Sequence, residues 1–163
     1  MATTVAPDVS TDLCFLLSRA SHALLTEQTA ALSELGISPR AHCVLSRAMA
    51  GGLTQTELAE LCGLDKTTMV VTVDELEKAG LAERRPSSTD RRARIIEVTD
   101  SGRRMVAKGR KIVSRIHEDV LASLPHEIRE SFLAGLEQLV TDRLATPVHC
   151  DKPVRRRVPR AAH

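Results

Sequence analysis

The chain has 163 residues, of which 42% are hydrophobic and 27% are charged, and its formal net charge is +2. This balance is typical of one soluble globular domain and excludes a chain that is mainly disordered. No apolar run approaches the roughly 20 residues that a membrane span needs, and the first residues lack the features of a secretory signal, so we expect a cytoplasmic protein without a membrane partner.

The hydrophobic pattern then predicts six helices and one hairpin. Residues 1–10 are small and polar, and we expect them to form a flexible arm. From Thr11 onward, apolar residues recur at helical spacing until Gly36. A second helix follows, with Ser38 as its N-cap and Pro39 at its first position.

Two short helices and a hairpin come next. Thr54 and Glu57 form a capping box at the start of the first short helix, which Gly63 ends. Asp65 caps the second helix, and two such helices around a glycine turn are typical of a helix-turn-helix. Residues 81–99 read as two strands with a polar tip between them. Together these elements predict a winged helix.

Two longer helices complete the pattern. Thr99 caps the first, and Pro125 begins the second, which extends to Leu144. The apolar faces of these helices and of the first helix are too exposed for a compact monomer and indicate a homodimer. We therefore expect a mainly α fold of the α+β winged-helix type. Its expected parts are the flexible arm at residues 1–10, a helical dimerisation region at 11–36 and 99–144, a winged helix-turn-helix lobe at 38–98, and a basic, disordered tail at 145–163.

Five arginines lie between residues 84 and 94 of this nearly neutral chain. Such a run alone is often solvated charge, but beside a helix-turn-helix it favours binding to double-stranded DNA. The second short helix would enter the major groove by its N-terminus, the wing tip would reach the minor groove, and the first short helix would bind a phosphate. Arg84 and Arg85 would be phosphate contacts beside the strand or solvated charge. The expected DNA contacts are Thr54, Gln55, Lys66, Thr67, Thr68, Arg91, Arg92 and Arg94.

The segment from Leu53 to Gly102 resembles the multiple antibiotic resistance regulator (MarR) family of dimeric winged-helix repressors, above all in "VDELEKAGL" and "DRRARIIEVTDSG". The helix order extends this resemblance to about residues 11–144. It implies a homodimer that binds a pseudo-palindromic operator and is released when a small ligand, an oxidant or a metal is sensed. It also implies that Arg92 is the wing-tip arginine and that Asp90 orients it. Many members carry Arg where this chain has Val71, so we expect affinity to depend more on the wing.

The same resemblance implies an effector pocket between the dimerisation helices and the DNA-binding lobe. We expect it to take a phenolic or anionic small molecule. The candidate pocket residues are Cys14, Ser18, Arg19, His22 and His42.

The protein could also sense one of two other signals, an oxidant or a metal ion. The stretch "DLCFLLSRA" resembles the organic hydroperoxide sensors of the family, in which the counterpart of Cys14 is a peroxidatic thiol. A buried, inert cysteine is the competing interpretation, and the absence of Tyr favours it, because those sensors hold the thiolate with tyrosines. Zinc-responsive members have a His at the position of His42, but the long helix offers only His117, so we predict no metal site.

Other classes of protein fit less well. The chain has no GxSxG, HExxH or glycine-rich phosphate loop, so we expect neither an enzyme nor a cofactor. A winged helix that only binds other proteins would not need a basic wing. The four cysteines at positions 14, 43, 62 and 150 are far apart and form no CxxC pair, so we expect free thiols.

Overall fold

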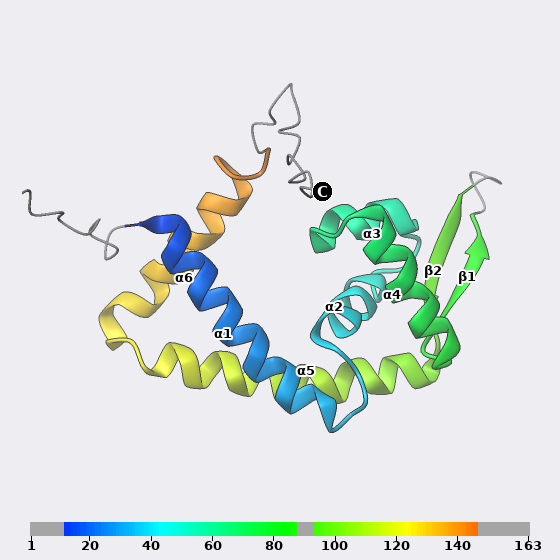
Figure 1. Cartoon of the computed structure of the whole chain (residues 1–163), viewed down its shortest axis with the longest axis horizontal. Coiled ribbons are helices and arrows are strands. Elements are labelled where there is room, and N and C mark those ends of the chain that lie inside the picture. Colours follow the sequence, from blue (N-terminus) through cyan, green and yellow to red (C-terminus); the bar gives the residue numbers. More distant parts are fainter. Residues whose placement is uncertain (1–11, 88–92, 147–163) are drawn as a thin grey trace, which may run out of the picture. The chain divides into compact units, whose positions relative to one another are not determined.

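A computed structural model describes residues 12–87 and 93–146 (Figure 1). The chain divides into two compact units, residues 1–119 and 120–163. Mostly helical structure with one small sheet confirms the expected fold class. The elements are α1 (Leu13–Ser33), α2 (Pro39–Ala48), α3 (Gln55–Cys62), α4 (Lys66–Lys78), β1 (Ala82–Pro86), β2 (Arg94–Val98), α5 (Asp100–Ala122) and α6 (His126–Thr141). The expected arm at residues 1–10 and nearly all of the expected tail lie outside the described residues.

Side chains cap the helices where the sequence indicates. Ser38 accepts a hydrogen bond from the Ala41 amide at 3.1 Å and begins α2. Thr54 and Glu57 form the complete capping box of α3, and Gly63 ends that helix at φ 62°, a left-handed conformation that favours glycine. Caps of this kind each contribute about 1 kcal/mol. The boundaries of the helix-turn-helix therefore follow from local sequence.

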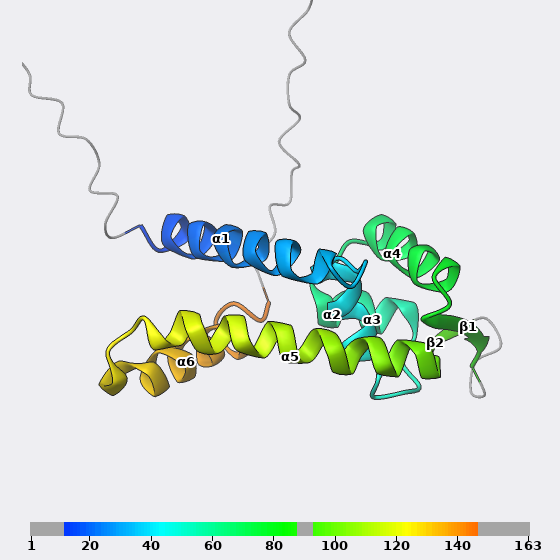
Figure 2. The same cartoon turned by 90° about the horizontal axis from the view of Figure 1, so that it is seen from below.

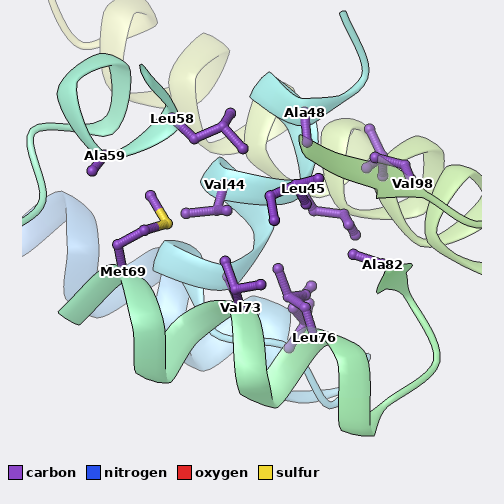
Figure 3. Packing of buried hydrophobic residues seen from close by; sticks show 14 of the residues in the cluster. Val44, Leu45, Ala48, Leu58, Ala59, Met69, Val73, Leu76, Ala82 and Val98 are labelled. Atoms are coloured by element: carbon purple, nitrogen blue, oxygen red, sulfur yellow. The ribbon is translucent and has the colours of Figure 1, made fainter. Parts of the chain in front are cut away.

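The core of the first unit lies between α2, α3, α4 and the hairpin (Figure 3). Leu32 of α1 and Val106 of α5 join it, so both long helices are anchored to the lobe. Burying each large aliphatic side chain contributes about 1.5–3 kcal/mol, which makes this cluster the main source of stability of the lobe. The fully buried side chains on the lobe include Val44, Leu45, Leu58, Met69, Val73, Leu76 and Ile96.

A third backbone segment, which the sequence analysis does not predict, pairs with the two strands of the wing. β1 and β2 are antiparallel, with Ala82 opposite Val98 and Pro86 opposite Arg94. In addition, the backbone before α3 pairs with β2, since the Ile96 amide donates to the Leu53 carbonyl at 3.0 Å and Thr54 forms a bridge with Ile95. The start of α3 is therefore joined to the wing sheet through the backbone.

Close backbone approaches position α5 against the lobe. A Cβ at Gly102 would overlap the Leu81 carbonyl, so only glycine allows the start of α5 to pack on the turn before β1. Gln28 of α1 is hydrogen-bonded to His117 of α5 at 3.0 Å; these two helices lie one above the other in Figure 2 and cross obliquely in Figure 1.

The second unit contains the last turn of α5 and α6. The Arg129 guanidinium donates to the carbonyls of Leu124 and Ala122, both at 2.9 Å, and so closes the loop between these helices. No residue of α6 is buried in the single chain. None of the helices in the described ranges is long and apolar enough to cross a membrane.

Candidate nucleic-acid interface and effector cavity

The first turn of α4 presents two of the expected DNA contacts to solvent. Lys66 and Thr67 are exposed there, where the amide groups and the helix dipole also favour a phosphate. Thr68 is different, because its hydroxyl donates to the Asp65 carboxylate at 2.6 Å and its amide donates to the same group at 2.9 Å. Thr68 therefore belongs to the helix cap, and Lys66 and Thr67 remain the accessible side chains of this turn.

Arg84 ties the wing to both helices of the helix-turn-helix. Its guanidinium pairs with Asp74 at 2.7 Å and with Glu77, and its Nε donates to Gln55 Oε1 at 3.2 Å. The Arg84 amide also donates to Glu77 at 2.7 Å. Two carboxylates thus balance this half-buried charge, so Arg84 is not a solvated charge, and a phosphate contact at Arg84 stays a prediction. The same contact occupies the side-chain oxygen of Gln55.

Arg85 is also balanced within the wing. It pairs with Glu83 at 3.1 Å and with Glu97 across the strands at 3.0 Å. Arg94 is exposed at the start of β2, opposite Pro86. Asp90, Arg91 and Arg92 lie outside the described residues, so their expected roles stay predictions.

Val71 is an apolar side chain on the exposed face of α4. It lies one turn after Thr67 and is 51% exposed, at the position where the family resemblance leads one to expect arginine. Thr54, at the start of α3, is half-buried and held in its capping box.

An open cavity along α5 has a volume of about 560 Å³, a size suited to a small-molecule ligand. Four cations and one carboxylate contribute to its wall. The lining residues are Met49, Arg103, Val106, Ala107, Arg110, Lys111, Ser114, Arg115 and Glu118. Sequence reasoning missed these cations because it followed the apolar face of the long helix; their spacing along the opposite face was the available signal.

His42 lies on the buried side of α2, against α5. It is 8% exposed, a Cβ at Gly109 would overlap its ring, and its Nε2 has no hydrogen-bond partner among the described residues. Burial lowers the pKa of His42; a backbone hydrogen bond to Val106 opposes this, and Arg110 adds to the lowering. The folded lobe therefore favours the neutral ring.

The other candidate effector residues lie on α1. Cys14, Ser18, Arg19 and His22 are exposed in the single chain, and Arg19 lies 5.7 Å from the centre of the Phe15 ring. Cys14 is therefore not buried within the single chain, and the choice between a peroxidatic and an inert thiol stays a prediction. None of the five candidates lines the α5 cavity, so their role stays a prediction. Within the described ranges, no three His, Cys, Asp or Glu side chains group to hold a metal.

Acidification is expected to destabilise the lobe through His42. Its pKa is lower in the folded chain, so the unfolded chain binds more protons as the pH falls below about 6.5. The contribution of the neutral His42 ring to the free energy of unfolding is fully present above that pH. It is lost as the pH falls toward the folded-state pKa of His42, with a slope of at most about 1.4 kcal/mol per pH unit. Urea unfolding between about pH 5 and 8 should give a flatter dependence for His42→Gln than for wild type. His22→Gln is the exposed control; equal slopes in wild type and His42→Gln would contradict the assignment.

Comparison with known proteins places this geometry in a family. The MarR family model matches residues 35–93. The transcriptional repressor CouR bound to a 23-mer DNA duplex is 30% identical, with 85% of this chain and 99% of that chain covered and a TM-score of 0.75. CouR from Rhodococcus jostii RHA1 bound to p-coumaroyl-CoA is 29% identical, with coverage of 88% and 100% and a TM-score of 0.74. A MarR-family transcriptional regulator from Rhodococcus sp. RHA1 is 28% identical, with coverage of 84% and 99% and a TM-score of 0.76. Since these matches include the long helices as well as the winged helix, the chain belongs to the MarR family of transcriptional regulators.

Proposed function

We propose that the protein is a homodimeric repressor that binds a pseudo-palindromic operator in double-stranded DNA and is released by an anionic small molecule. The observation that carries this proposal is the exposed first turn of α4, where Lys66 and Thr67 stand beside a wing that Arg84 locks to the same helix. A rigid helix and wing can engage neighbouring grooves together, since their relative position is set before binding. The likeness to CouR bound to DNA supports the same function.

The division of charge explains how a chain of net charge +2 can hold DNA. Arg84 and Arg85 are neutralised by carboxylates within the lobe. Lys66 is exposed at the positive end of α4, and the wing sequence supplies the further arginines. Because phosphate contacts release counterions, affinity that depends on such residues falls steeply with salt.

Replacing Lys66 with Ala should weaken binding to the DNA upstream of the protein's own gene. One phosphate contact would be lost, so the slope of log affinity against log salt should become shallower by about 1. Fluorescence anisotropy titrations at several salt concentrations measure both effects. Lys78→Ala, at the opposite end of α4, is the matched control and should bind as wild type does. Wild type that fails to bind this DNA at low salt would sink the repressor proposal.

Exposed apolar side chains on α1 and on α6 support a homodimer. Leu13, Leu16 and Leu25 of α1 are about half exposed in the single chain, and Phe132, Leu133 and Val140 of α6 are too. Leaving this many large apolar side chains in water is unfavourable, and covering each one contributes on the order of 1 kcal/mol. A second copy of the chain is the partner that would cover both sets in a symmetric assembly.

A charge among the exposed apolar side chains of α6 should break the dimer. Phe132→Asp would bury a carboxylate without a partner, which costs several kcal/mol of association free energy, so a monomer is expected in sedimentation velocity at micromolar concentration. Leu61→Asp, at a position 54% exposed on α3, should leave the dimer intact. If the wild type itself sediments as a monomer, the homodimer proposal is wrong.

The α5 cavity supports an anionic effector. Arg103, Arg110 and Arg115 line it, and guanidinium groups bind carboxylates and phosphates through charge-assisted hydrogen bonds. The cavity also lies next to His42, through Arg110 and Val106. A ligand there would contact both α5 and the end of α2 at Met49, and so act on the lobe. The p-coumaroyl-CoA bound to CouR is an anion of this class.

Loss of a cavity arginine should weaken anion binding without weakening DNA binding. Calorimetric titration with p-coumaroyl-CoA, coenzyme A and p-coumarate identifies the preferred anion, and Arg115→Ala should reduce its affinity by about tenfold, the effect of one charge-assisted hydrogen bond. Arg104→Ala is the control, because Arg104 is exposed and bonds to Ser101 at 3.0 Å outside the cavity. Equal losses in both variants would reject the cavity as the effector site.

A further inference from the structure

Two cysteines that are distant in sequence meet between α2 and α3. The Sγ atoms of Cys43 and Cys62 lie 4.0 Å apart. Cys43 is exposed and Cys62 is half-buried, and both are free thiols. Since no third ligand side chain joins them within the described ranges, the pair lacks the shell of a tetrahedral metal site. Oxidation to a disulfide needs only these two thiols and one two-electron oxidant.

The surroundings give the two thiols different roles. Burial, followed by the charge of an ionised Cys43 and a hydrogen bond to it, raises the pKa of the Cys62 thiol to about 12, while Arg47 acts in the opposite direction. Cys62 therefore keeps its proton at neutral pH and is a poor first nucleophile. Cys43 is exposed to solvent, where a small oxidant can reach it, so it is the thiol that reacts first.

We propose that Cys43 and Cys62 form an oxidation site at which a hydroperoxide closes an intramolecular disulfide, and that this disulfide weakens DNA binding. The first half of the proposal stands on the geometry of the thiol pair. The second half rests on the proposed DNA-binding function.

The reaction balances with a hydroperoxide as the only oxidant. The Cys43 thiolate attacks one peroxide oxygen, the O–O bond breaks, and an alcohol leaves after taking up a proton, which gives a sulfenic acid on Cys43. The Cys62 sulfur then attacks the Cys43 sulfur, the S–O bond breaks, and the hydroxyl group leaves as water with the proton of Cys62. Two thiols and one hydroperoxide thus become one disulfide, one alcohol and one water, and the two sulfurs together lose two electrons.

The position of Cys62 connects this reaction to the recognition helix. Cys62 is the last residue of α3, and only Gly63 and Leu64 separate it from Asp65, the N-cap of α4. The Leu64 amide donates to the Ala59 carbonyl at 2.9 Å, which binds this turn to α3. Closing the sulfurs from 4.0 Å to the roughly 2 Å of a disulfide ties the end of α3 covalently to α2. This bond constrains the turn that leads from Cys62 into α4.

The test uses the full-length Cys14→Ser/Cys150→Ser protein, in which only the proposed pair remains. After treatment with cumene hydroperoxide, we expect both thiols to be lost to thiol titration, a Cys43–Cys62 linked peptide in the mass spectrum, and reversal by dithiothreitol. Affinity for the upstream DNA should fall by about tenfold and recover on reduction. Adding Cys43→Ser or Cys62→Ser to this background should abolish both changes, with circular dichroism confirming that each variant is folded.

The other possible outcomes distinguish the oxidation site, its regulatory role and the DNA-binding function. Retained thiols, or sulfinic acid on Cys43 without the linked peptide, would overturn the oxidation site. A disulfide that leaves DNA affinity unchanged would overturn its regulatory role. A peroxide response seen in wild type but absent from Cys14→Ser/Cys150→Ser would assign the response to the other two cysteines and reject the pair. Failure of the reduced protein to bind DNA at all would instead contradict the proposed function, and the peptide map would still decide whether the disulfide forms.

Discussion

Arg84 connects the three elements on which the lobe depends. From β1 it reaches Asp74 and Glu77 of α4 and Gln55 of α3, and its side chain is 23% exposed. Ion pairs of this kind add little net stability, because desolvation offsets much of their attraction. The energy of the lobe comes from the apolar core. Arg84 instead holds the wing in a fixed position relative to α4, because breaking its contacts would leave the half-buried charges of Arg84 and Glu77 without partners.

This constraint divides the basic residues of the chain into two groups. Arg84 joins the wing to α4 and Arg85 pairs with carboxylates of the two strands, whereas Lys66 is exposed at the start of α4 and four cations of α5 line the cavity. The α5 cations lie along a helix that packs through Gly102 and Gly109 against the turn before β1 and against His42. A ligand bound to them would therefore act on a helix whose contacts with the lobe leave no free space, and small shifts would be passed on to the lobe.

Most of the secondary structure could be predicted because its causes are local. The cap at Ser38, the capping box at Thr54 and the left-handed glycine at position 63 each act within a few residues, and all three occur as expected. The third backbone segment beside the wing could not be predicted, because Leu53 and Ile96 are far apart in sequence. For the same reason the half-buried state of Arg84 was not predicted, because its carboxylate partners Asp74 and Glu77 on α4 become neighbours only after folding.

Taken alone, the sequence determined the order of the elements, the winged helix and the family resemblance, since periodicity, caps and motifs are properties of neighbouring residues. It also predicted Lys66, Thr67 and Thr68 as contacts at the start of α4, of which Lys66 and Thr67 are exposed and Thr68 belongs to the helix cap. Only the tertiary structure decided which distant side chains meet. It brought His42 against Gly109, gathered four cations around one cavity, and placed Cys43 within 4.0 Å of Cys62. The physical reason is that such contacts depend on the packing angles of α2, α3 and α5, which the whole core sets jointly and no single segment encodes.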